Sequence, residues 1–245
     1  MRATKVEAHE KSFFDTGVDS GGKKHILTPF DADGLPMIGC KLANGDKSFY
    51  YEEEVPKERI VVHFTQGYLK GDVDTLTKPN NHVSVAFVVA RNGAIVNLWS
   101  SRFWSYHLGQ GASGGNKAMS SRSVAIEISN IGCLKKTANG MTTEYGDIYC
   151  DLAEQEFYTE VPPFRERTHF ATFTDAQVDA TIKLLRYLTA KYAIPAAFLP
   201  PESRYGIVAD VADFRGITTH VNYRKDKWDI GPAFDWDRVV AGVTA

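Results

Sequence analysis

The chain is poor in cysteine and has no long apolar run. Its 245 residues include three cysteines, Cys40, Cys133 and Cys150. This odd, sparse set without a close pair argues against a disulfide framework and against a cysteine-based zinc ribbon. No stretch approaches the ~18 apolar residues that span a bilayer, and the N-terminal MRATKVEAHEKSFF has no apolar core of signal-peptide length. We therefore expect a chain made in the cytoplasm, without a signal peptide and without membrane insertion.

An excess of charge of either sign is also missing. Lys and Arg number 28 and Asp and Glu number 30, so the formal net charge is −2. This near-neutral balance argues against bulk binding of nucleic acid. The chain is 43% hydrophobic, 12% aromatic and 24% charged, which is typical of a globular protein and excludes disorder and coiled coil. Its length allows one large domain or two small ones.

Short apolar runs and one long helical stripe predict a mixed α/β fold. The runs typical of buried strands are Ile60–Val62, Val83–Val89, Ala94–Trp99 and Ser123–Ile128. Asn92-Gly93 predicts a tight hairpin turn between the second and third runs. Thr174 and Gln177 form a capping box at the start of a helix that Pro195 ends, and a shorter helix is expected from Pro232 to the C-terminus. This order favours a single α/β domain.

Three segments carry weaker signals. Residues 1–57 are polar and rich in turns, so we expect an N-terminal arm with little regular structure and a short hairpin near 37–52. Residues 131–170 are expected to be an irregular insertion. The glycine-rich segment 109–115 lacks the Gly-Lys-Ser/Thr ending of a phosphate loop, and no helical pattern follows it directly, so a flexible surface loop is favoured.

Two of the seven histidines have distinctive settings. His63 ends the apolar run of residues 60–62, so we expect it at the end of a buried strand, where the strand opens onto a cleft. His220 follows Gly-Ile-Thr-Thr, and Asp229 comes nine residues later. From these residues alone, structural histidines and a helix-capping Asp229 remain open alternatives. A His-Glu-x-x-His motif is absent, so any zinc site must be assembled from distant segments.

Five segments, in order, resemble motifs of the zinc-dependent N-acetylmuramoyl-L-alanine amidases. This family includes phage lysozyme-type and muropeptide-recycling amidases and is related to the peptidoglycan recognition proteins. The segments are V-V-H-F-T-Q-G at 61–67 (family V-I-H-H-T-x-G), F-V-V-A-R-N-G at 87–93 (F-V-I-x-R-D-G), Y-H-L-G at 106–109 (W-H-A-G), S-V-A-I-E-I at 123–128 (S-I-G-I-E-I), and G-I-T-T-H at 216–220 with K-W-D-I-G-P-A-F-D-W at 227–236 (G-I-x-x-H and K-x-D-P-G-P-x-F-D-W). The resemblance covers roughly residues 58–240.

The resemblance implies a fold and a metal site. It implies a single amidase-type domain at 58–245, with the insertion at about 131–170 and the arm at 1–57 as additions. Its central mixed β-sheet would be flanked by helices, with a zinc cleft at the strand ends. By the same resemblance, His63, His220 and Asp229 hold one catalytic Zn²⁺, and a fourth position stays open for water.

The resemblance also implies roles in cleaving the amide between N-acetylmuramic acid and L-alanine. Glu127 matches the family's acidic residue, and its apolar neighbours favour a raised pKa suited to proton transfer. Lys227 matches a lysine two residues before the last ligand, placed to stabilise an oxyanion. Without the motif, Glu127 would be interpreted as a solvent-facing strand residue and Lys227 as a solvated lysine.

Candidate substrate contacts are less defined. His107 corresponds to a groove position, and a plain surface histidine, or one that supports a metal ligand without touching substrate, is an equal alternative. Asn130 and Arg165 are candidates for sugar or carboxylate contacts, with an ordinary surface arginine as the alternative. Three departures from the motifs also stand out. Phe64 replaces a non-ligand histidine, Val85 stands where many members have tyrosine, and Ile230 replaces a proline, which predicts a looser loop after Asp229.

Two classes of function therefore stay in view. The first is a zinc amidase acting on peptidoglycan or muropeptides, and the second is a non-catalytic peptidoglycan-binding module on the same fold. An amidase without a signal peptide suits a phage endolysin released through the membrane, an injected bacteriolytic effector, or cytoplasmic muropeptide recycling. The lytic setting is favoured, and the oligomeric state is not predicted.

Overall fold

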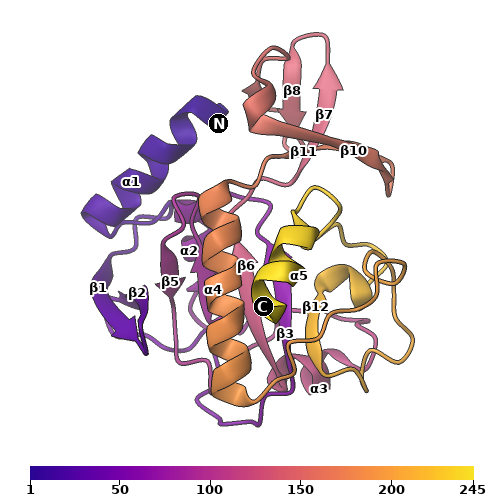
Figure 1. The fold of residues 1–245 in the computed structure, drawn as a ribbon. Coiled ribbons are helices and arrows are strands. Elements are labelled where there is room, and N and C mark those ends of the chain that lie inside the picture. The colour runs from indigo at the N-terminus through magenta and orange to yellow at the C-terminus, as the bar shows by residue number, and fades with distance from the viewer.

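A seven-stranded mixed sheet forms the centre of the molecule, which is described here from a computed structural model of residues 1–245 (Figure 1). Its strand order is β1-β2-β5-β4-β6-β3-β12. The bounds are β1 His25–Ala32, β2 Leu35–Leu42, β3 Arg59–Phe64, β4 Phe87–Val89, β5 Ile95–Asn97, β6 Ser123–Ile128 and β12 Gly216–Thr219. β4, β6, β3 and β12 run parallel to one another, whereas β1 pairs antiparallel with β2 and β4 with β5.

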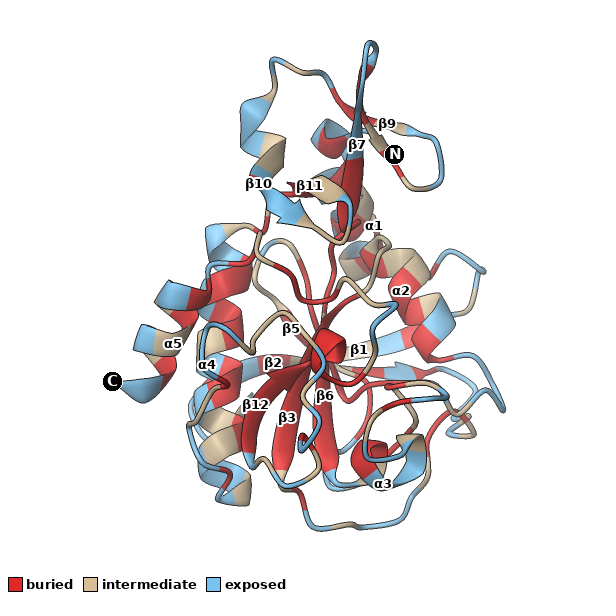
Figure 2. Ribbon diagram, turned by 90° about the vertical axis from the view of Figure 1, so that its right-hand side faces the viewer, coloured by how far each residue is buried: buried red, intermediate tan, exposed pale blue.

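Helices cover both faces of this sheet. Figure 2 shows α4 and α5 on one side and α2 and α3 on the other. The bounds are α1 Val6–Thr16, α2 Leu69–Leu76, α3 Asn116–Ser121, α4 Asp175–Tyr192 and α5 Trp236–Thr244, with single 3-10 turns at Ala3–Lys5, Gln155–Phe157 and His220–Asn222. The predicted mixed sheet flanked by helices is therefore confirmed, as is the capping box between Thr174 and Gln177.

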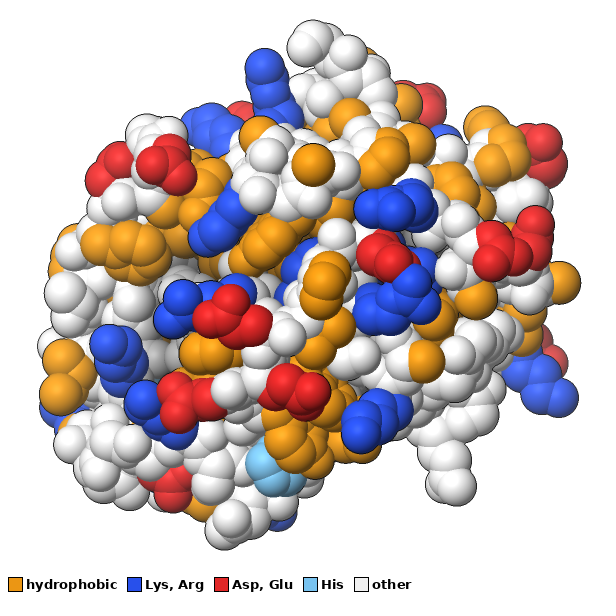
Figure 3. All heavy atoms as spheres, turned by 90° about the horizontal axis from the view of Figure 1, so that it is seen from below, with side chains coloured by type: hydrophobic (Ala, Val, Ile, Leu, Met, Phe, Trp, Pro, Cys, Tyr) orange, Lys and Arg blue, Asp and Glu red, His pale blue; other side chains and the backbone are white.

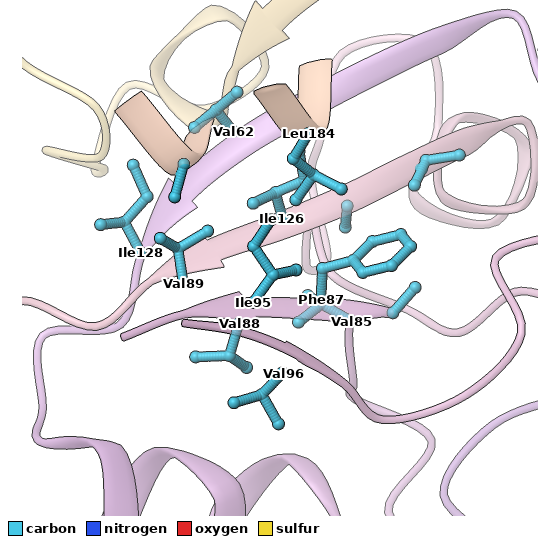
Figure 4. Close-up of a cluster of buried hydrophobic side chains, with 14 of the residues drawn as sticks. Val62, Val85, Phe87, Val88, Val89, Ile95, Val96, Ile126, Ile128 and Leu184 are labelled. Carbon is cyan, nitrogen blue, oxygen red and sulfur yellow. The ribbon is translucent and has the colours of Figure 1, made fainter. Parts of the chain in front are cut away.

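The central strands are buried on both faces, as parallel strands covered by helices must be. All six residues of β3 are buried. Figure 4 shows Val62, Ile126, Ile128 and Leu184 packed together between the sheet and α4. Val61 points the other way, into a separate cluster with Leu108. Because side chains alternate along a strand, His63 shares the face of Val61 and points away from α4.

A second sheet lies beyond the C-terminal end of β6, at the top of Figure 1. Its strand order is β10-β11-β7-β8-β9, and its bounds are β7 Cys133–Thr137, β8 Gly140–Thr143, β9 Ile148–Cys150, β10 Tyr158–Phe164 and β11 Arg167–Ala171. The expectation that 131–170 is irregular was therefore wrong. The strands gave no alternating signal because consecutive residues such as Lys135, Lys136 and Thr137 are all exposed.

Three other expectations need correction. The N-terminal hairpin turns at 33–34 rather than within 37–52, and its second strand pairs with β5, so residues 25–42 are part of the main sheet. The short helix α3 directly follows the glycine-rich loop, although its six residues show no amphipathic repeat. The last helix begins at Trp236 rather than near Pro232, with Asp235 as its N-cap.

On the face shown in Figure 3, acidic and basic side chains are interspersed and form no large patch of one charge. This matches the nearly balanced composition. No helix of the structure combines the length and the apolar character that a membrane span requires.

Candidate metal centre

The candidate site is built on one row of residues across adjacent parallel strands. His63 is the Cα partner of Glu127 in the β3–β6 ladder, and Glu127 is the partner of Val88 in the β6–β4 ladder. His220 follows β12 directly after Thr219, which pairs with Val62. The row therefore places His220, His63 and Glu127 side by side at the end of the sheet.

Three potential ligand atoms converge on one point. The Nδ1 atoms of His63 and His220 lie 3.1 Å apart, and each lies 2.9 Å from Oδ2 of Asp229. All three residues are buried. Two imidazoles and a carboxylate are donors that zinc uses in catalytic sites.

A chain of hydrogen bonds fixes which nitrogen of His63 faces this point. The hydroxyl of Ser123 donates to the Met119 carbonyl at 2.8 Å, so its oxygen must accept from Nε2 of His107 at 2.7 Å. Nδ1 of His107 then accepts from Nε2 of His63 at 3.0 Å. Burial lowers the pKa of His63 to about 4, so its imidazole is neutral and its Nδ1 carries a lone pair.

His220 is held in the same way. Its Nε2 donates to the carbonyl of Leu108 at 2.9 Å, which leaves Nδ1 facing Asp229. Such an outer hydrogen bond to a carbonyl is typical of metal-bound histidine. Burial opposes ionisation of Asp229, but His220 and His63 outweigh it and hold the pKa of that carboxyl below its usual range. Both Nδ1 atoms and Oδ2 of Asp229 therefore face one point, where a cation would be stabilised by all three groups.

Asp229 does not cap a helix. It lies six residues before Asp235, the N-cap of α5, and its own backbone carbonyl accepts from the amide of Val221 at 3.0 Å. This bond ties the Asp229 segment to the turn that carries His220. Ile230, which stands in place of the family's proline, is fully buried and packs the segment after Asp229 against the main core, and the looser loop stays a prediction.

Glu127 lies beside the candidate metal ligands, opposite His63 in the β3–β6 ladder. Its Oε2 is buried and has no hydrogen-bond partner in the protein. Burial raises the pKa of Glu127 well above its usual value, and the charges of Asp229 and Asp72 raise it further. The nearby Lys227 ammonium acts in the opposite direction.

Lys227 faces the same centre. Its charge lowers the pKa of both His63 and Glu127, so its ammonium lies within electrostatic reach of both. Its side chain makes no hydrogen bond or ion pair of its own and is half-buried. A cation held in this way is available to a ligand.

The three residues predicted to contact substrate, His107, Asn130 and Arg165, lie in different parts of the structure. His107 stands behind His63 in the hydrogen-bond chain to Ser123. Asn130 is buried, donates to the carbonyls of Ala171 and Thr172, and accepts from the amide of Gly132. Its side chain therefore joins the two sheets, and a role in substrate binding stays a prediction.

Arg165 lies at the tip of the β10–β11 hairpin, near the loop that carries Lys227. Its Nη1 donates to the carbonyls of Arg224 and Lys227. Its predicted contact with substrate is untested.

The roles of two residues of this region were not predicted from the sequence. Ser123 completes the chain behind His63, but it lies 16 residues from His107 and meets it only in the fold. Asp72, on α2, is buried and accepts from the Ser129 hydroxyl at 2.6 Å, and burial raises its pKa to about 6. Ser123 is the first residue of the S-V-A-I-E-I segment, which indicates no role for its hydroxyl, and nothing around Asp72 distinguishes it from an ordinary polar position.

Comparison with protein families gives this site a context. The chain matches the family described as N-acetylmuramoyl-L-alanine amidase over residues 53–232, well over half of its length. The chain therefore belongs to the N-acetylmuramoyl-L-alanine amidase family. The match includes every candidate metal ligand together with Glu127 and Lys227. A search of curated proteins found no match.

Solved structures of amidases are distantly similar. AmiD from E. coli, in complex with an anhydro-N-acetylmuramyl peptide, is 20% identical, with 87% of this chain and 65% of that chain covered and a TM-score of 0.49. AmpDh3 from Pseudomonas aeruginosa is 15% identical over 78% and 61% of the two chains, with a TM-score of 0.48. The endolysin LysCS from Clostridium intestinale is 15% identical over 78% and 85%, with a TM-score of 0.42. This chain thus spans less than two thirds of the first two, and the assignment depends on the family match.

Proposed function

We propose that this chain hydrolyses the amide bond between the lactyl group of N-acetylmuramic acid and L-alanine, with one zinc ion held by His63, His220 and Asp229. The observation that carries the proposal is the convergence of three ligand atoms within 4.8 Å of one another in a chain of the amidase family. The donor set suits zinc. Bound there, zinc would supply a Lewis acid that polarises a carbonyl and lowers the pKa of water.

Glu127 is proposed to move the proton. Its position opposite His63 in the ladder brings its carboxyl group to the metal side of the sheet. The unpartnered Oε2 is free to accept a proton from water and to pass it to the amine nitrogen that leaves. Burial raises the pKa of Glu127 well above its usual value, which makes the carboxyl group a stronger proton acceptor than an exposed glutamate.

Lys227 is proposed to offset negative charge on the carbonyl oxygen as it develops. The ammonium group is near His63 and Glu127 and has no partner in the protein. A preorganised cation in a buried site contributes more than the same charge in water. The alternative interpretation, a solvated lysine, fits poorly with a half-buried side chain whose charge acts on both His63 and Glu127.

The same geometry favours hydrolysis over simple binding. A binding module requires neither a buried, unpartnered carboxylate nor the chain of hydrogen bonds behind His63. A muramyl dipeptide incubated with zinc-loaded protein should release a new primary amine, detected with an amine-reactive dye. Glu127→Gln should bind zinc and release almost none. Saturable binding of the dipeptide by the zinc-loaded wild type, without release of amine, would favour the binding module.

The cellular setting is a finer proposal, and we favour a lytic role. A lytic amidase should clear suspensions of intact cell walls, whereas a recycling enzyme should act mainly on soluble muropeptides. Rates on purified walls and on soluble muropeptides, measured with one preparation, separate these settings.

A further inference from the structure

The tip of the β10–β11 hairpin contacts the loop that precedes Asp229. The guanidinium of Arg165 donates through Nη1 to the carbonyl of Arg224 at 3.3 Å and to the carbonyl of Lys227. In return, the indole nitrogen of Trp228 donates to the carbonyl of Arg165 at 3.4 Å. A single residue of the second sheet therefore contacts both ends of the segment 224–228.

Within that loop the Arg224 guanidinium donates to both carboxylate oxygens of Asp226, but the backbone of the loop has little hydrogen bonding of its own. None of the amides of residues 225–228 donates a hydrogen bond. The hydrogen bonds that the backbone carbonyls of 224–228 accept all come from Arg165. Packing adds to the contact, because Phe164 lies in one apolar cluster with Trp228 and Arg167 lies over the Trp228 ring at 5.8 Å.

The hairpin tip is an unfavourable place for a long side chain. Phe164 pairs with Arg167, so residues 165 and 166 alone form the turn. Both have left-handed backbones, with φ of 48° at Arg165 and 65° at Glu166. Two-residue turns of this kind favour Asn-Gly, and non-glycine residues there carry strain. A strained arginine whose side chain supports the neighbouring loop is best explained by that support.

We propose that Arg165 is a positioning residue, which braces the 224–228 loop so that Lys227 and Asp229 face the metal centre. The inference rests on the proposed function for the roles of those two residues. It also assigns a role to the second sheet, because the β10–β11 hairpin carries Arg165. It differs from the prediction that Arg165 binds the substrate, because its guanidinium is already engaged with backbone carbonyls.

The variant Arg165→Gly tests the guanidinium separately from the conformation of the hairpin turn. Glycine accepts the left-handed backbone, so the variant loses the guanidinium while the turn relaxes. The matched control is Glu166→Gly, which relaxes the adjacent left-handed residue and removes an exposed side chain that makes no hydrogen bond. Both variants are expected to melt at or above the wild-type temperature.

Two measurements decide the proposal without relying on turnover. Zinc affinity, measured by competition with a chromogenic chelator, should fall about 10-fold or more in Arg165→Gly, as is usual when support of a metal ligand is lost. Hydrogen exchange of the Val221 amide, which donates to the Asp229 carbonyl, should accelerate. Glu166→Gly should match the wild type in both. Arg165→Met, which keeps the aliphatic stem, should repeat the loss if the glycine variant folds poorly.

Turnover then distinguishes the two roles of Arg165. If Arg165 positions the loop, kcat should fall in Arg165→Gly because Lys227 is misplaced. If Arg165 binds the substrate instead, only KM should rise and zinc affinity should not change. Wild-type zinc affinity together with wild-type exchange at Val221 in Arg165→Gly would overturn the brace. If the wild type proves to have no amidase activity, the zinc and exchange measurements still test the brace, so the two proposals fail separately.

Discussion

His63 and Glu127 are direct partners in the register of two parallel strands, β3 and β6. A shift of one residue in this register would turn one of the two side chains to the α4 face, because side chains alternate along a strand. The sheet core therefore fixes the relation between the proposed metal ligand and the proposed base. Both strands are held by apolar packing that includes Val62 and Ile126.

The metal ligands can be tested by removing them singly. His63→Ala and His220→Ala should each lose stoichiometric zinc and activity, because two remaining ligands hold the ion poorly. His9→Ala, which removes a half-buried histidine of α1, is the control and should bind zinc as the wild type does. Elemental analysis after gel filtration measures the zinc. Full zinc content in either ligand variant would contradict this ligand set.

Glu127→Gln should separate metal binding from catalysis. The amide keeps the shape of the side chain but cannot accept a proton as the carboxylate does. We expect full zinc content, an unchanged melting temperature and a loss of turnover of about 10²–10⁴-fold. Turnover near that of the wild type would assign the base elsewhere, with His107 as the next candidate.

Lys227→Met keeps the apolar stem and removes the ammonium. If the ammonium stabilises the oxyanion, the barrier should rise by roughly 2.7–4 kcal/mol, with the loss in kcat rather than in KM. Lys225→Met, an exposed lysine of the same loop, should change neither constant. Steady-state kinetics on a soluble muropeptide decide, and an unchanged kcat in Lys227→Met would return this residue to the surface.

The hydrogen-bond chain behind His63 predicts an effect of a residue that touches no ligand. Ser123→Ala removes the acceptor for Nε2 of His107, so the tautomer of His63 is no longer enforced. Zinc affinity should fall about 10–100-fold. The control is Ser121→Ala, whose hydroxyl donates only to the Ala118 carbonyl. Equal zinc affinities in the two variants would show that the chain has no influence on the metal.

Glu10 predicts a pH dependence of stability. It is buried, accepts from the amide of Arg91, and burial raises its pKa from 4.5 to about 7. Between these pH values the folded state binds a proton that the unfolded chain lacks, so this residue's contribution to stability falls as pH rises. Between pH 4.5 and 7.5, Glu10→Gln should remove a change of about 3 kcal/mol at most. Urea unfolding at several pH values measures it, and parallel profiles for the two proteins would refute it.

The elements that were predicted correctly are those whose sequence signals lie within a few consecutive residues. β6 and the start of α4 were predicted because a buried apolar run and the Thr174 capping box act within a few residues. The second sheet was not, because strands such as β7 expose consecutive side chains and pack on a small cluster of their own. β1 was also missed, since it exposes Ile26 and Phe30 and so resembles a loop.

The candidate site also has a part that the sequence indicated and a part that it did not. The proposed ligands were predicted through the resemblance, since no rule of spacing unites His63 with His220 across 157 residues. The supporting residues escaped prediction because they act through contacts that only the fold creates. Ser123 reaches His63 through His107, and Arg165 reaches the Asp229 loop from another sheet.

Mass spectrometry of purified peptidoglycan digested in H₂¹⁸O tests the central claim most directly. The account predicts that zinc-loaded protein releases stem peptides with a free L-alanine amine and leaves intact glycan, each new lactyl carboxylate carrying one ¹⁸O. His63→Ala and chelator-treated protein should release neither product. Peptides that stay attached to muramic acid after digestion by the zinc-loaded protein, with cleavage elsewhere or nowhere, would contradict it.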